Sequence, residues 1–437
     1  MNIIIIGGSF AGVTAAIAAR NKYPKASIML IEKETEIGFI PSALPLLLSG
    51  HLKNLDEAKF VNVIELTEKR IDVQLGAQVV SICTSNNSVT AVTAVGVTEW
   101  SYDKLILATG SSQVKSHIVG IDNMGVIKYK DKKSAQEALK LVDSGEHFTI
   151  IGGGQVGIEM ANALSVQNKK VSLVESMPSL LLKYFDDDML TSLYGAMSNQ
   201  RMTCYLNESV KEIIKTEKET VVITSKRHIK CDGAIFAINV TPNISYLPKD
   251  VTCHEDGTIW VNNYLQTSVN NIFAIGDCIQ IPYSLSSDSF YIPLTNNAVR
   301  SAILAVENLE VRSKEFVGTV RTIGTHVFGY YLASSGMTES ESVFFEEAIQ
   351  TKVMILPLSL LDKTKTVQIK LIYSQEKQIV LGAQLISREN ILEKINLLSF
   401  AIQSGHTLND LVQKDYFFNP LFTPLLDITN QVGCSES

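Results

Sequence analysis

Two glycine-rich segments have the residue types and the spacing that bind a pyrophosphate. They read GGSFAG at residues 7–12 and GGGQVG at residues 152–157. In such a turn the first glycine permits the bend, the second lets phosphate approach the backbone, and the third allows close helix–strand packing. The N-terminus of the following helix offers free N–H groups and a positive dipole end. One such turn can occur without a ligand, but two copies in equivalent settings predict two dinucleotide sites.

Each turn lies between an expected strand and an expected helix. Apolar strands are predicted at residues 2–6 and 148–151, and second strands at residues 27–31 and 170–174. These are two βαβ units, which indicate parallel sheets. Ser9 replaces the middle glycine of the first turn, and its small side chain is compatible with the assignment.

An acidic residue ends each unit and would accept hydrogen bonds from the adenosine ribose. These acids are Glu32 and Glu175, and no arginine follows either of them to hold a 2′-phosphate. Because Glu175 would also repel that phosphate, NADH is favoured over NADPH. The residues expected to contact the dinucleotides are Gly7, Ser9, Phe10, Ala11, Gly12, Glu32 and Lys33 at the first turn, and Gly152, Gly154, Gln155, Val156, Gly157 and Glu175 at the second.

Two further segments indicate where a flavin would lie. Residues 102–110 form an apolar strand that ends in a small, polar turn, and residues 271–278 form a strand that ends at Asp277. Ligands of open α/β sheets lie beyond the carboxyl ends of the strands, so both segments point to one crevice. We expect Asp277 to bind the ribityl chain of the flavin, the alternative being an aspartate in a surface turn.

The composition excludes several classes of protein. The chain has 437 residues, 46% of them hydrophobic and 19% charged, with a net charge of −7. At roughly 150 residues per domain this length suggests about three domains, each with a core of its own. Disorder is excluded, and the lack of a dense basic stripe argues against a nucleic-acid partner.

The cysteines and the N-terminus indicate a cellular compartment. The six cysteines are scattered without a CxxC motif, as expected for reduced thiols. The start lacks the basic region of a signal peptide, and no run approaches the ~20 apolar residues of a membrane span. We expect a cytoplasmic protein. The seven histidines lack metal-ligand spacing, so no metal site is predicted.

The sequence resembles the flavin-dependent pyridine nucleotide–disulfide oxidoreductases, in particular the NADH oxidase, NADH peroxidase and coenzyme A-disulfide reductase branch. The resemblance runs nearly end to end. The segments that carry it, besides the two turns, are ATG at 108–110, TPN at 241–243, IGDC at 275–278, PLTNNAVR at 293–300, GAQ at 382–384 and FFNP at 417–420.

The resemblance implies a glutathione-reductase-like α/β fold with two Rossmann-like dinucleotide-binding domains and a C-terminal α+β dimerisation domain. It implies an FAD domain at residues 1–112 and 245–319, an NADH domain at 113–244, and a dimerisation domain at 320–437. Homodimers of this kind place the tail of the partner near the flavin. The aromatic tail from Asp415 onward is therefore expected at a dimer interface, the alternative being ordinary core.

The resemblance also implies further contacts to the cofactors. Glu159 would lie on the nicotinamide side and Tyr184 near the adenosine of NADH. The further FAD contacts are expected at Ser42, Val80, Ala108, Thr109, Gly110, Leu294 and Thr295.

Three positions depart from the family pattern. Ser42 stands where these proteins carry a redox cysteine, Phe10 where they carry a histidine, and Gln155 where many have a tyrosine. A serine has neither a thiolate at neutral pH nor a reversible oxidation ladder. Thiol-dependent reduction of disulfides or peroxide is therefore not expected. The alternative role for Ser42 is to cap a helix at residues 42–48, and Cys278 is expected to be structural.

These features predict an FAD-dependent NADH oxidoreductase in which Ser42, Phe10 and Glu159 are the catalytic candidates. A hydride passes from NADH to FAD, and electrons then pass directly to an acceptor. The expected acceptor is O2 and the expected product hydrogen peroxide, although water formation stays open. The alternative acceptors are a quinone or another small molecule, or a ferredoxin- or rubredoxin-type carrier.

A carrier would need a basic docking patch. The candidate residues are Lys128, Lys130, Lys132 and Lys133, which also fit a solvated loop. A protein that binds FAD and NADH without catalysis is the remaining alternative.

Overall fold

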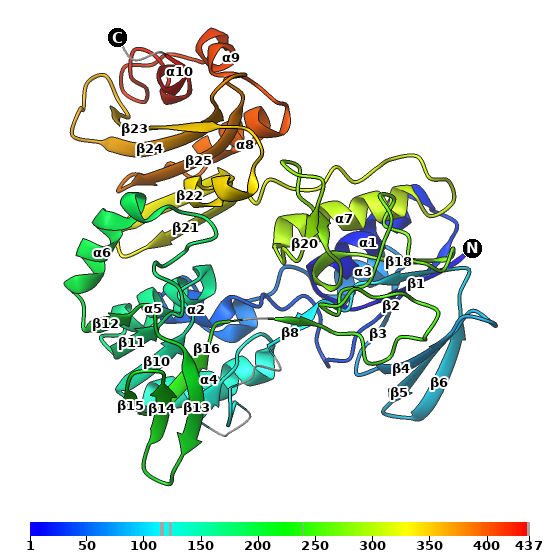
Figure 1. Cartoon of the computed structure of the whole chain (residues 1–437). Helices are drawn as coiled ribbons and strands as arrows, with labels where there is room; N and C mark the ends of the chain where they lie inside the picture. The colour runs from blue at the N-terminus through cyan, green and yellow to red at the C-terminus, as the bar shows by residue number, and fades with distance from the viewer. Residues whose placement is uncertain (114–117, 122–124, 239, 435–437) are drawn as a thin grey trace.

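The computed structural model describes residues 1–113, 118–121, 125–238 and 240–434. Three five-stranded sheets organise the chain, two of them parallel and one antiparallel. Figure 1 shows the first parallel sheet in one lobe, and the second parallel sheet in another lobe with the antiparallel sheet above it. The predicted fold class, with two Rossmann-like units and a C-terminal dimerisation domain, is confirmed.

The first parallel sheet has the strand order β18-β7-β1-β2-β3. The strand β18 comes from far along the chain, so residues beyond 240 complete a sheet that begins at the N-terminus. The helices α1 (Phe10–Lys22) and α7 (Thr295–Glu307) pack against each other on this sheet. The strands are β1 (Asn2–Ile6), β2 (Ser27–Ile31), β3 (Asp72–Gln74), β7 (Lys104–Leu107) and β18 (Ile272–Ala274).

The second parallel sheet repeats this plan with the order β12-β11-β10-β16-β9. Its strands β10 and β11 pair in parallel over their whole length, as β1 and β2 do. The strands are β9 (Val126–Ile127), β10 (His147–Ile151), β11 (Lys170–Val174), β12 (Met202–Tyr205) and β16 (Gly233–Phe236). The helices are α4 (Lys132–Ser144), α5 (Gln155–Val166) and α6 (Thr191–Ser198).

Small antiparallel ribbons accompany the two parallel sheets. The ribbon β8–β17 joins residues 111–112 to residues 241–242, where the chain passes between the two lobes. The three-stranded ribbons are β4 (Gln78–Cys83), β5 (Ser88–Thr93) and β6 (Gly96–Ser101), and β13 (Val210–Lys215), β14 (Thr220–Thr224) and β15 (His228–Cys231). The remaining short elements are α2 (Ala43–Leu48), α3 (Val63–Glu68), β8 (Ser111–Ser112), β17 (Thr241–Pro242), β19 (Ile281–Pro282) and β20 (Ser289–Phe290).

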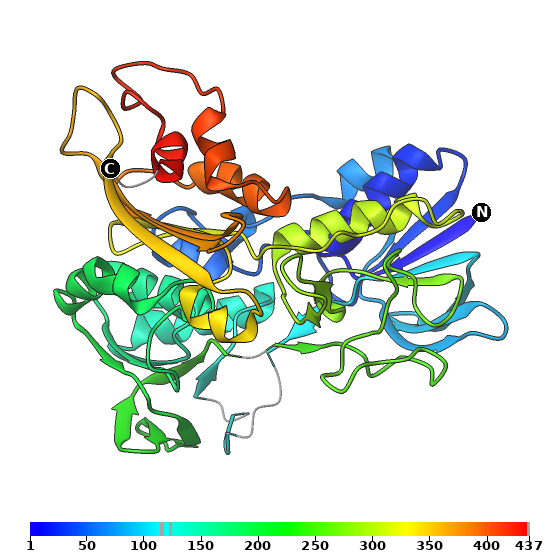
Figure 2. The same ribbon diagram turned by 45° about the horizontal axis from the view of Figure 1, so that its top comes forward.

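The C-terminal sheet is antiparallel, with the order β21-β22-β25-β24-β23, and α8 packs on it (Figure 2). Its strands are β21 (Ile323–Val327), β22 (Tyr330–Gly336), β23 (Ile349–Pro357), β24 (Thr366–Ser374) and β25 (Val380–Ser387). Its helices are α8 (Lys394–Gln403), α9 (Leu408–Gln413) and α10 (Ile428–Gly433). The 3₁₀ helices of the chain are η1 (Leu55–Glu57), η2 (Asp187–Leu190), η3 (Gly276–Cys278) and η4 (Glu339–Phe344).

The aromatic tail does not belong to the core of the chain. The side chains of Phe417, Phe418 and Phe422 are 69%, 53% and 70% exposed. The interpretation of this segment as ordinary core is therefore wrong. None of the described helices is long and apolar enough to cross a membrane.

Candidate active site

The two glycine turns have the same geometry, and glycine is required at their first and last positions. Gly7 and Gly152 have φ angles of 110° and 108°, which side chains other than hydrogen rarely allow. A Cβ on Gly12 would overlap the carbonyl oxygen of Gly7, and a Cβ on Gly157 would overlap that of Gly152. The helices α1 and α5 therefore begin directly against their strands.

The middle position of each turn is open. Gly154 precedes α5 in an extended conformation, and a Cβ built on it meets nothing within 4 Å. Ser9 precedes α1 with a similar backbone, at φ −96° and ψ −163°, and its hydroxyl makes no capping bond to the helix. Both turns thus leave room for a pyrophosphate beside a helix N-terminus, with the serine in place of the glycine.

The two acids take the same position beside their turns. Glu32 Oε2 accepts a hydrogen bond of 2.6 Å from the Gly8 N–H, and Glu175 Oε2 accepts one of 2.6 Å from the Gly153 N–H. Burial raises the pKa of Glu32, although hydrogen bonds from the Glu34 and Gly8 N–H groups oppose this shift. Each carboxylate is thereby held at the carboxyl end of its strand, as the ribose interaction requires.

Asp277 lies on η3, at the junction of the two lobes. Its Oδ2 accepts a hydrogen bond of 3.0 Å from the Ser111 hydroxyl and lies 3.6 Å from Lys130 Nζ. Burial lowers the pKa of Lys130, in spite of the opposing effect of Asp277. Asp277 is thus a partly buried junction residue rather than one of a surface turn.

Two of the motif segments meet behind this junction. The Thr109 hydroxyl donates to the Asn243 carbonyl oxygen at 3.0 Å, and Asn243 Nδ2 donates to the Thr109 carbonyl oxygen at 2.8 Å. Ala108 is buried, and Gly110 has a φ of 61° with open space where a Cβ would lie. The two crossings between the lobes are therefore tied to each other.

Ser42 directly precedes α2 and is exposed at the junction. Its side chain makes no capping bond, so the interpretation of Ser42 as a helix cap is wrong. The helix α2 packs against α5 and belongs to the core of the second sheet (Figure 1). Gln167 Nε2 also donates to the Leu48 carbonyl oxygen at 2.6 Å. The segment that contains Ser42 and α2 follows the first βαβ unit in sequence but packs on the second sheet.

Phe10 is the first residue of α1 and stacks on Phe60, with ring centroids 4.5 Å apart and an interplanar angle of 19°. Phe60 N donates to the Gly38 carbonyl oxygen, and Gly38 N donates to that of Gly8. The aromatic pair is therefore fixed beside the first turn, and it supplies no proton donor there.

Glu159 is held from two sides. Its Oε1 accepts hydrogen bonds from Gln155 Nε2 at 3.0 Å and from the Thr325 hydroxyl at 2.8 Å. Thr325 belongs to β21 of the C-terminal sheet, so this contact joins two distant parts of the chain. Sequence reasoning missed Thr325, because nothing in its local pattern signals a contact with α5.

The other candidate residues have varied surroundings. Lys33 is exposed and pairs with Glu34 at 3.4 Å, and Val80 is exposed on β4. Ala11 is buried, whereas Val156 is exposed on α5. Burial raises the pKa of Tyr184, and the charges of Arg321 and Glu341 also act on its hydroxyl.

The helix α7 presents its N-terminus near η3. Leu294 is its N-cap residue, and Thr295 is its exposed first residue. Asn297 is buried, and within the described ranges no donor reaches its Oδ1. This orphaned acceptor, together with the open turns, fits a polar cofactor in the crevice.

The lysine run is not a free basic patch. Lys132 Nζ lies 2.6 Å from Glu36 Oε1 and 2.6 Å from Asp56 Oδ1, and Lys130 pairs with Asp277.

Cys278 is fully buried, and desolvation raises the pKa of its thiol to about 12, as expected for a structural residue. The part of the chain that the structure describes holds no group of three or more His, Cys, Asp or Glu side chains suited to a metal.

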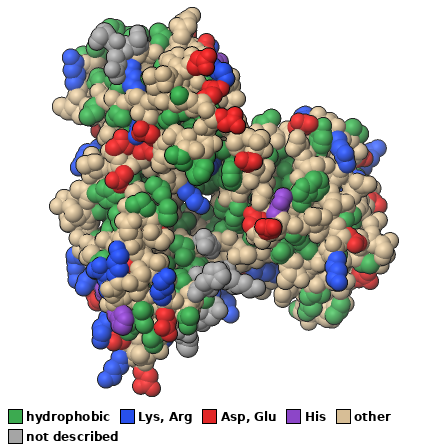
Figure 3. All heavy atoms as spheres, viewed as in Figure 1, with side chains coloured by type: hydrophobic (Ala, Val, Ile, Leu, Met, Phe, Trp, Pro, Cys, Tyr) green, Lys and Arg blue, Asp and Glu red, His purple; other side chains and the backbone are tan. Residues whose placement is uncertain are grey.

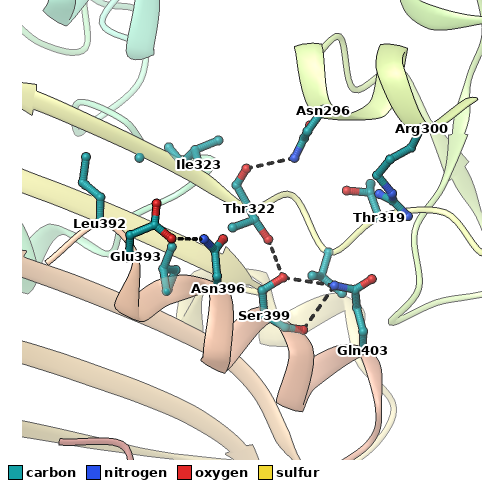
Figure 4. Close-up of a pocket in the computed structure, with 13 residues that line it drawn as sticks. Asn296, Arg300, Thr319, Thr322, Ile323, Leu392, Glu393, Asn396, Ser399 and Gln403 are labelled. Carbon is teal, nitrogen blue, oxygen red and sulfur yellow. Dashed lines mark hydrogen bonds between the residues drawn. The ribbon is translucent and has the colours of Figure 1, made fainter. Parts of the chain in front are cut away.

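A separate cavity of about 360 Å³ lies between α7, residues 319–324 and α8 (Figure 4). The Thr322 hydroxyl shares a hydrogen bond of 2.7 Å with that of Ser399 on its wall. The lining contains no residue of either glycine turn, so this cavity is not the dinucleotide crevice. Figure 3 shows a notch between the C-terminal domain and the lobe of the first sheet.

Two glycine turns, each with an acid bonded beside it, are typical of oxidoreductases that bring a flavin and a pyridine nucleotide together. The profile of the pyridine nucleotide-disulphide oxidoreductases matches residues 1–302, and the profile of their dimerisation domain matches residues 323–427. The chain belongs to this family. It is accordingly an enzyme that uses FAD and NADH.

Individual relatives agree over nearly the whole chain. An NADH oxidase of Enterococcus faecalis is 30% identical, covering 97% of this chain and 96% of its own. The crystal structure of a family oxidoreductase from Enterococcus faecalis V583 is 40% identical at a TM-score of 0.91, covering 99% and 98%. A water-forming NADH oxidase from Lactobacillus brevis, bound to NADH, is 26% identical at a TM-score of 0.94, covering 99% and 97%.

Proposed function

We propose that this protein is an NADH oxidase that passes electrons from NADH through FAD to O2 without a protein thiol. The observation that carries the proposal is the presence of two intact dinucleotide turns beside a serine at position 42. The NADH oxidases among its relatives support O2 as the acceptor. The pairing of Lys130 and Lys132 with acids weakens the case for a carrier protein.

We assign FAD to the first turn and NADH to the second. The FAD contacts are Gly7, Ser9, Phe10, Ala11, Gly12, Glu32, Lys33, Ser42, Val80, Ala108, Thr109, Gly110, Asp277, Leu294 and Thr295. The NADH contacts are Gly152, Gly154, Gln155, Val156, Gly157, Glu159, Glu175 and Tyr184.

The residues of the chain position the reactants and exclude water. FAD held at the first turn would supply the acceptor for the hydride of NADH and the route of its electrons to the final acceptor. The two turns hold the pyrophosphates, and Glu159, fixed by Gln155 and Thr325, orients the nicotinamide side. Holding the reacting atoms in contact makes the transfer effectively unimolecular. The Phe10–Phe60 pair leaves the acceptor side apolar, which suits O2.

The expected overall reaction is NADH + H⁺ + O2 → NAD⁺ + H2O2. Ser42 offers no thiolate that could reduce the peroxide further. Because the Lactobacillus brevis relative is described as water-forming, the product must be measured rather than transferred from a relative.

We also propose a cytoplasmic homodimer with FAD residues 1–112 and 245–319, NADH residues 113–244 and dimerisation residues 320–437. The pairing of β8 with β17 near residues 112 and 241 supports the first boundaries. Large exposed apolar patches mark interaction sites. The exposed apolar side chains near the C-terminus that would form the interface are Phe400, Phe417, Phe418, Leu421, Phe422 and Leu425.

An anaerobic NADH titration followed by air tests the oxidase proposal. We expect full reduction at about two electrons per FAD, then fast reoxidation with one peroxide per NADH. About four electrons per FAD would reveal a second redox centre and contradict the thiol-free mechanism. Slow reoxidation in air would contradict O2 as the acceptor. Sedimentation of the same sample at several concentrations tests the homodimer.

A further inference from the structure

A buried lysine of the C-terminal sheet lies among acids from two parts of the chain. Lys370 stands on β24, and its side chain is 2% exposed. Its Nζ lies 2.6 Å from Glu339 Oε2, 2.9 Å from Asp188 Oδ1 and 3.3 Å from Asp186 Oδ2. The two aspartates follow the second βαβ unit, whereas Lys370 and Glu339 belong to the C-terminal domain. We call these residues, with Gln384, the Lys370 cluster.

Asp186 is the most fully bonded member of the cluster. Its Oδ2 accepts from Gln384 Nε2 at 2.6 Å and from the Glu339 N–H at 3.0 Å, and its Oδ1 accepts from the Ser340 N–H at 3.1 Å. Its own N–H donates to Gln384 Oε1 at 2.9 Å. All of these partners belong to the C-terminal domain. Asp186 is thus bonded to a different domain through both its carboxylate and its backbone N–H.

Both central charges are retained in spite of burial. Burial would raise the pKa of Asp186, but the hydrogen bonds from Glu339, Gln384 and Ser340 outweigh it and the pKa is lowered. Burial likewise would lower the pKa of Lys370, but its bonds to Glu339 and Asp188 outweigh it and the pKa is raised. An ion pair that is this well bonded holds its geometry, because breaking it leaves an uncompensated buried charge.

Residues 175–186 follow β11 in sequence and lie against the second glycine turn. Glu175 accepts the Gly153 N–H, and Leu181 N donates to the Gly153 carbonyl oxygen at 2.9 Å. A Cβ on Gly153 would meet Leu180 Cδ2, so the segment packs directly on the turn. Leu181 is buried with a φ of 52°, a strained conformation that persists only where its surroundings impose it.

We propose that Lys370 and Asp186 are positioning residues for NADH: the Lys370 cluster holds residues 175–186 against the second glycine turn, so that the C-terminal domain sets the affinity for NADH. This proposal rests on the assignment of NADH to residues 152–157. Neither Lys370 nor Asp186 needs to touch the nucleotide. If the cluster loosens, Leu181 and Glu175 shift relative to Gly153, and the sites for the ribose and the pyrophosphate lose their alignment.

The test replaces Lys370 by methionine in the FAD-loaded full chain and measures anaerobic flavin reduction against NADH concentration. We expect the Kd for NADH to rise roughly tenfold, while the limiting reduction rate and the KM for O2 change less than about twofold. Lys370→Arg, which keeps the charge, should recover most of the affinity. An unchanged Kd, or equal losses in NADH affinity, FAD retention and O2 kinetics, would overturn the proposal.

Lys352→Met is the matched control. Lys352 is also buried, lies on the neighbouring strand β23, and donates to the Cys434 carbonyl oxygen. Among the described residues its hydrogen bond goes to Cys434 and not to residues 175–186. We expect NADH affinity to stay within about twofold of the parent protein. A loss as large as that of Lys370→Met would mean general destabilisation and overturn the proposal.

Two more variants keep the outcome interpretable. If Lys370→Met does not fold, Asp188→Asn carries the test, because Asp188 is half-exposed and the substitution removes a negative charge that both of its carboxylate oxygens present to Lys370 Nζ. It should weaken NADH binding about threefold, and an unchanged Kd would overturn the proposal. Glu175→Gln tests the underlying site. If it weakens NADH binding and Lys370→Met does not, only the positioning role fails. If it has no effect, the assignment of NADH to this turn fails.

Discussion

The Thr325 hydroxyl donates a hydrogen bond to Glu159 Oε1 at 2.8 Å, and so joins the C-terminal sheet to the first turns of α5. The Asn162 side chain, one turn further along α5, accepts the Phe328 N–H at 2.8 Å. The helix that begins at the second glycine turn is therefore fixed from the C-terminal domain as well as from its own sheet. The C-terminal sheet thus also helps to hold the helix to which we assign NADH.

Removal of the Thr325 hydroxyl should slow hydride transfer. Thr325→Val keeps the shape of the side chain and, among the described residues, leaves Gln155 as the donor to Glu159. A typical hydrogen bond contributes about 1 kcal/mol, so the limiting rate of anaerobic flavin reduction should fall about fivefold. Thr325→Ser, which keeps the donor, should stay within about twofold. Equal rates for the two variants would contradict a positioning role for this hydroxyl.

Substitutions at Ser42 should separate thiol chemistry from flavin chemistry. Ser42→Ala should retain oxidase activity within about twofold, because the serine supplies no redox group. Ser42→Cys, once peroxide has oxidised the new thiol to a sulfenic acid, should raise the electrons taken up from about two to about four per FAD, because reduction of the sulfenic acid to the thiol consumes two more. Anaerobic titration with NADH measures both. A loss of activity beyond tenfold in Ser42→Ala would show that the hydroxyl takes part in the reaction.

The two glycines of the second turn should respond differently to alanine. A Cβ on Gly157 overlaps the Gly152 carbonyl oxygen, so Gly157→Ala should destabilise the protein by about 2 kcal/mol or more. Gly154→Ala meets open space and an ordinary backbone, so the melting temperature should hold. Its Cβ is smaller than the side chain that Ser9 places at the equivalent position of the first turn, so NADH binding should stay within about twofold of the parent protein. A loss of NADH binding as large as that of Gly157→Ala would contradict the open middle position.

The nucleotide preference should follow the charge beside the second turn. Glu175 Oε1 accepts the Met177 N–H, so its carboxylate is fixed where a 2′-phosphate would lie. Replacing Glu175 by alanine and Ser176 by arginine removes the repulsion and adds a bidentate phosphate donor. The ratio of kcat/KM for NADPH to that for NADH should rise at least about tenfold. Steady-state assays with both nucleotides measure it, and an unchanged ratio would contradict the assignment of this acid.

The Lys370 cluster should make the free energy of unfolding depend on pH in the acid range. The pKa of Asp186 lies below its ordinary value of 3.8, so in acid the unfolded chain takes up the proton first. The ionised Asp186 side chain stabilises the fold at pH values above its ordinary pKa. This stabilisation is lost as the pH falls through the lower pKa that Asp186 has in the folded chain. Asp186→Asn should therefore melt lower than the parent at neutral pH, and the difference should narrow toward about pH 3. A constant difference across the range would show that the charge of Asp186 is not involved.

Much of the fold was already determined by local sequence. The strands at residues 27–31 and 170–174 have the predicted bounds. A short apolar run between a helix and an acid is typical of a buried strand in a parallel sheet. Gly7 and Gly152 have the positive φ angles that their motifs require. These features depend on backbone sterics and on burial within a few residues, and both can be seen in a linear sequence.

Contacts between distant segments depended on the tertiary structure. The acidic run at residues 186–188 lies at the start of η2, and two of its carboxylates pair with Lys370 of the C-terminal domain. The sequence identified Ser42 as the substituted position. It did not predict that the following helix, α2, would pack on α5 in the core of the second sheet. Only the folded chain brings such residues together, because their partners lie far apart in sequence and each side chain has several locally acceptable environments. The sequence determined which cofactor sites the protein carries, and the packing of its domains decided what holds those sites in place.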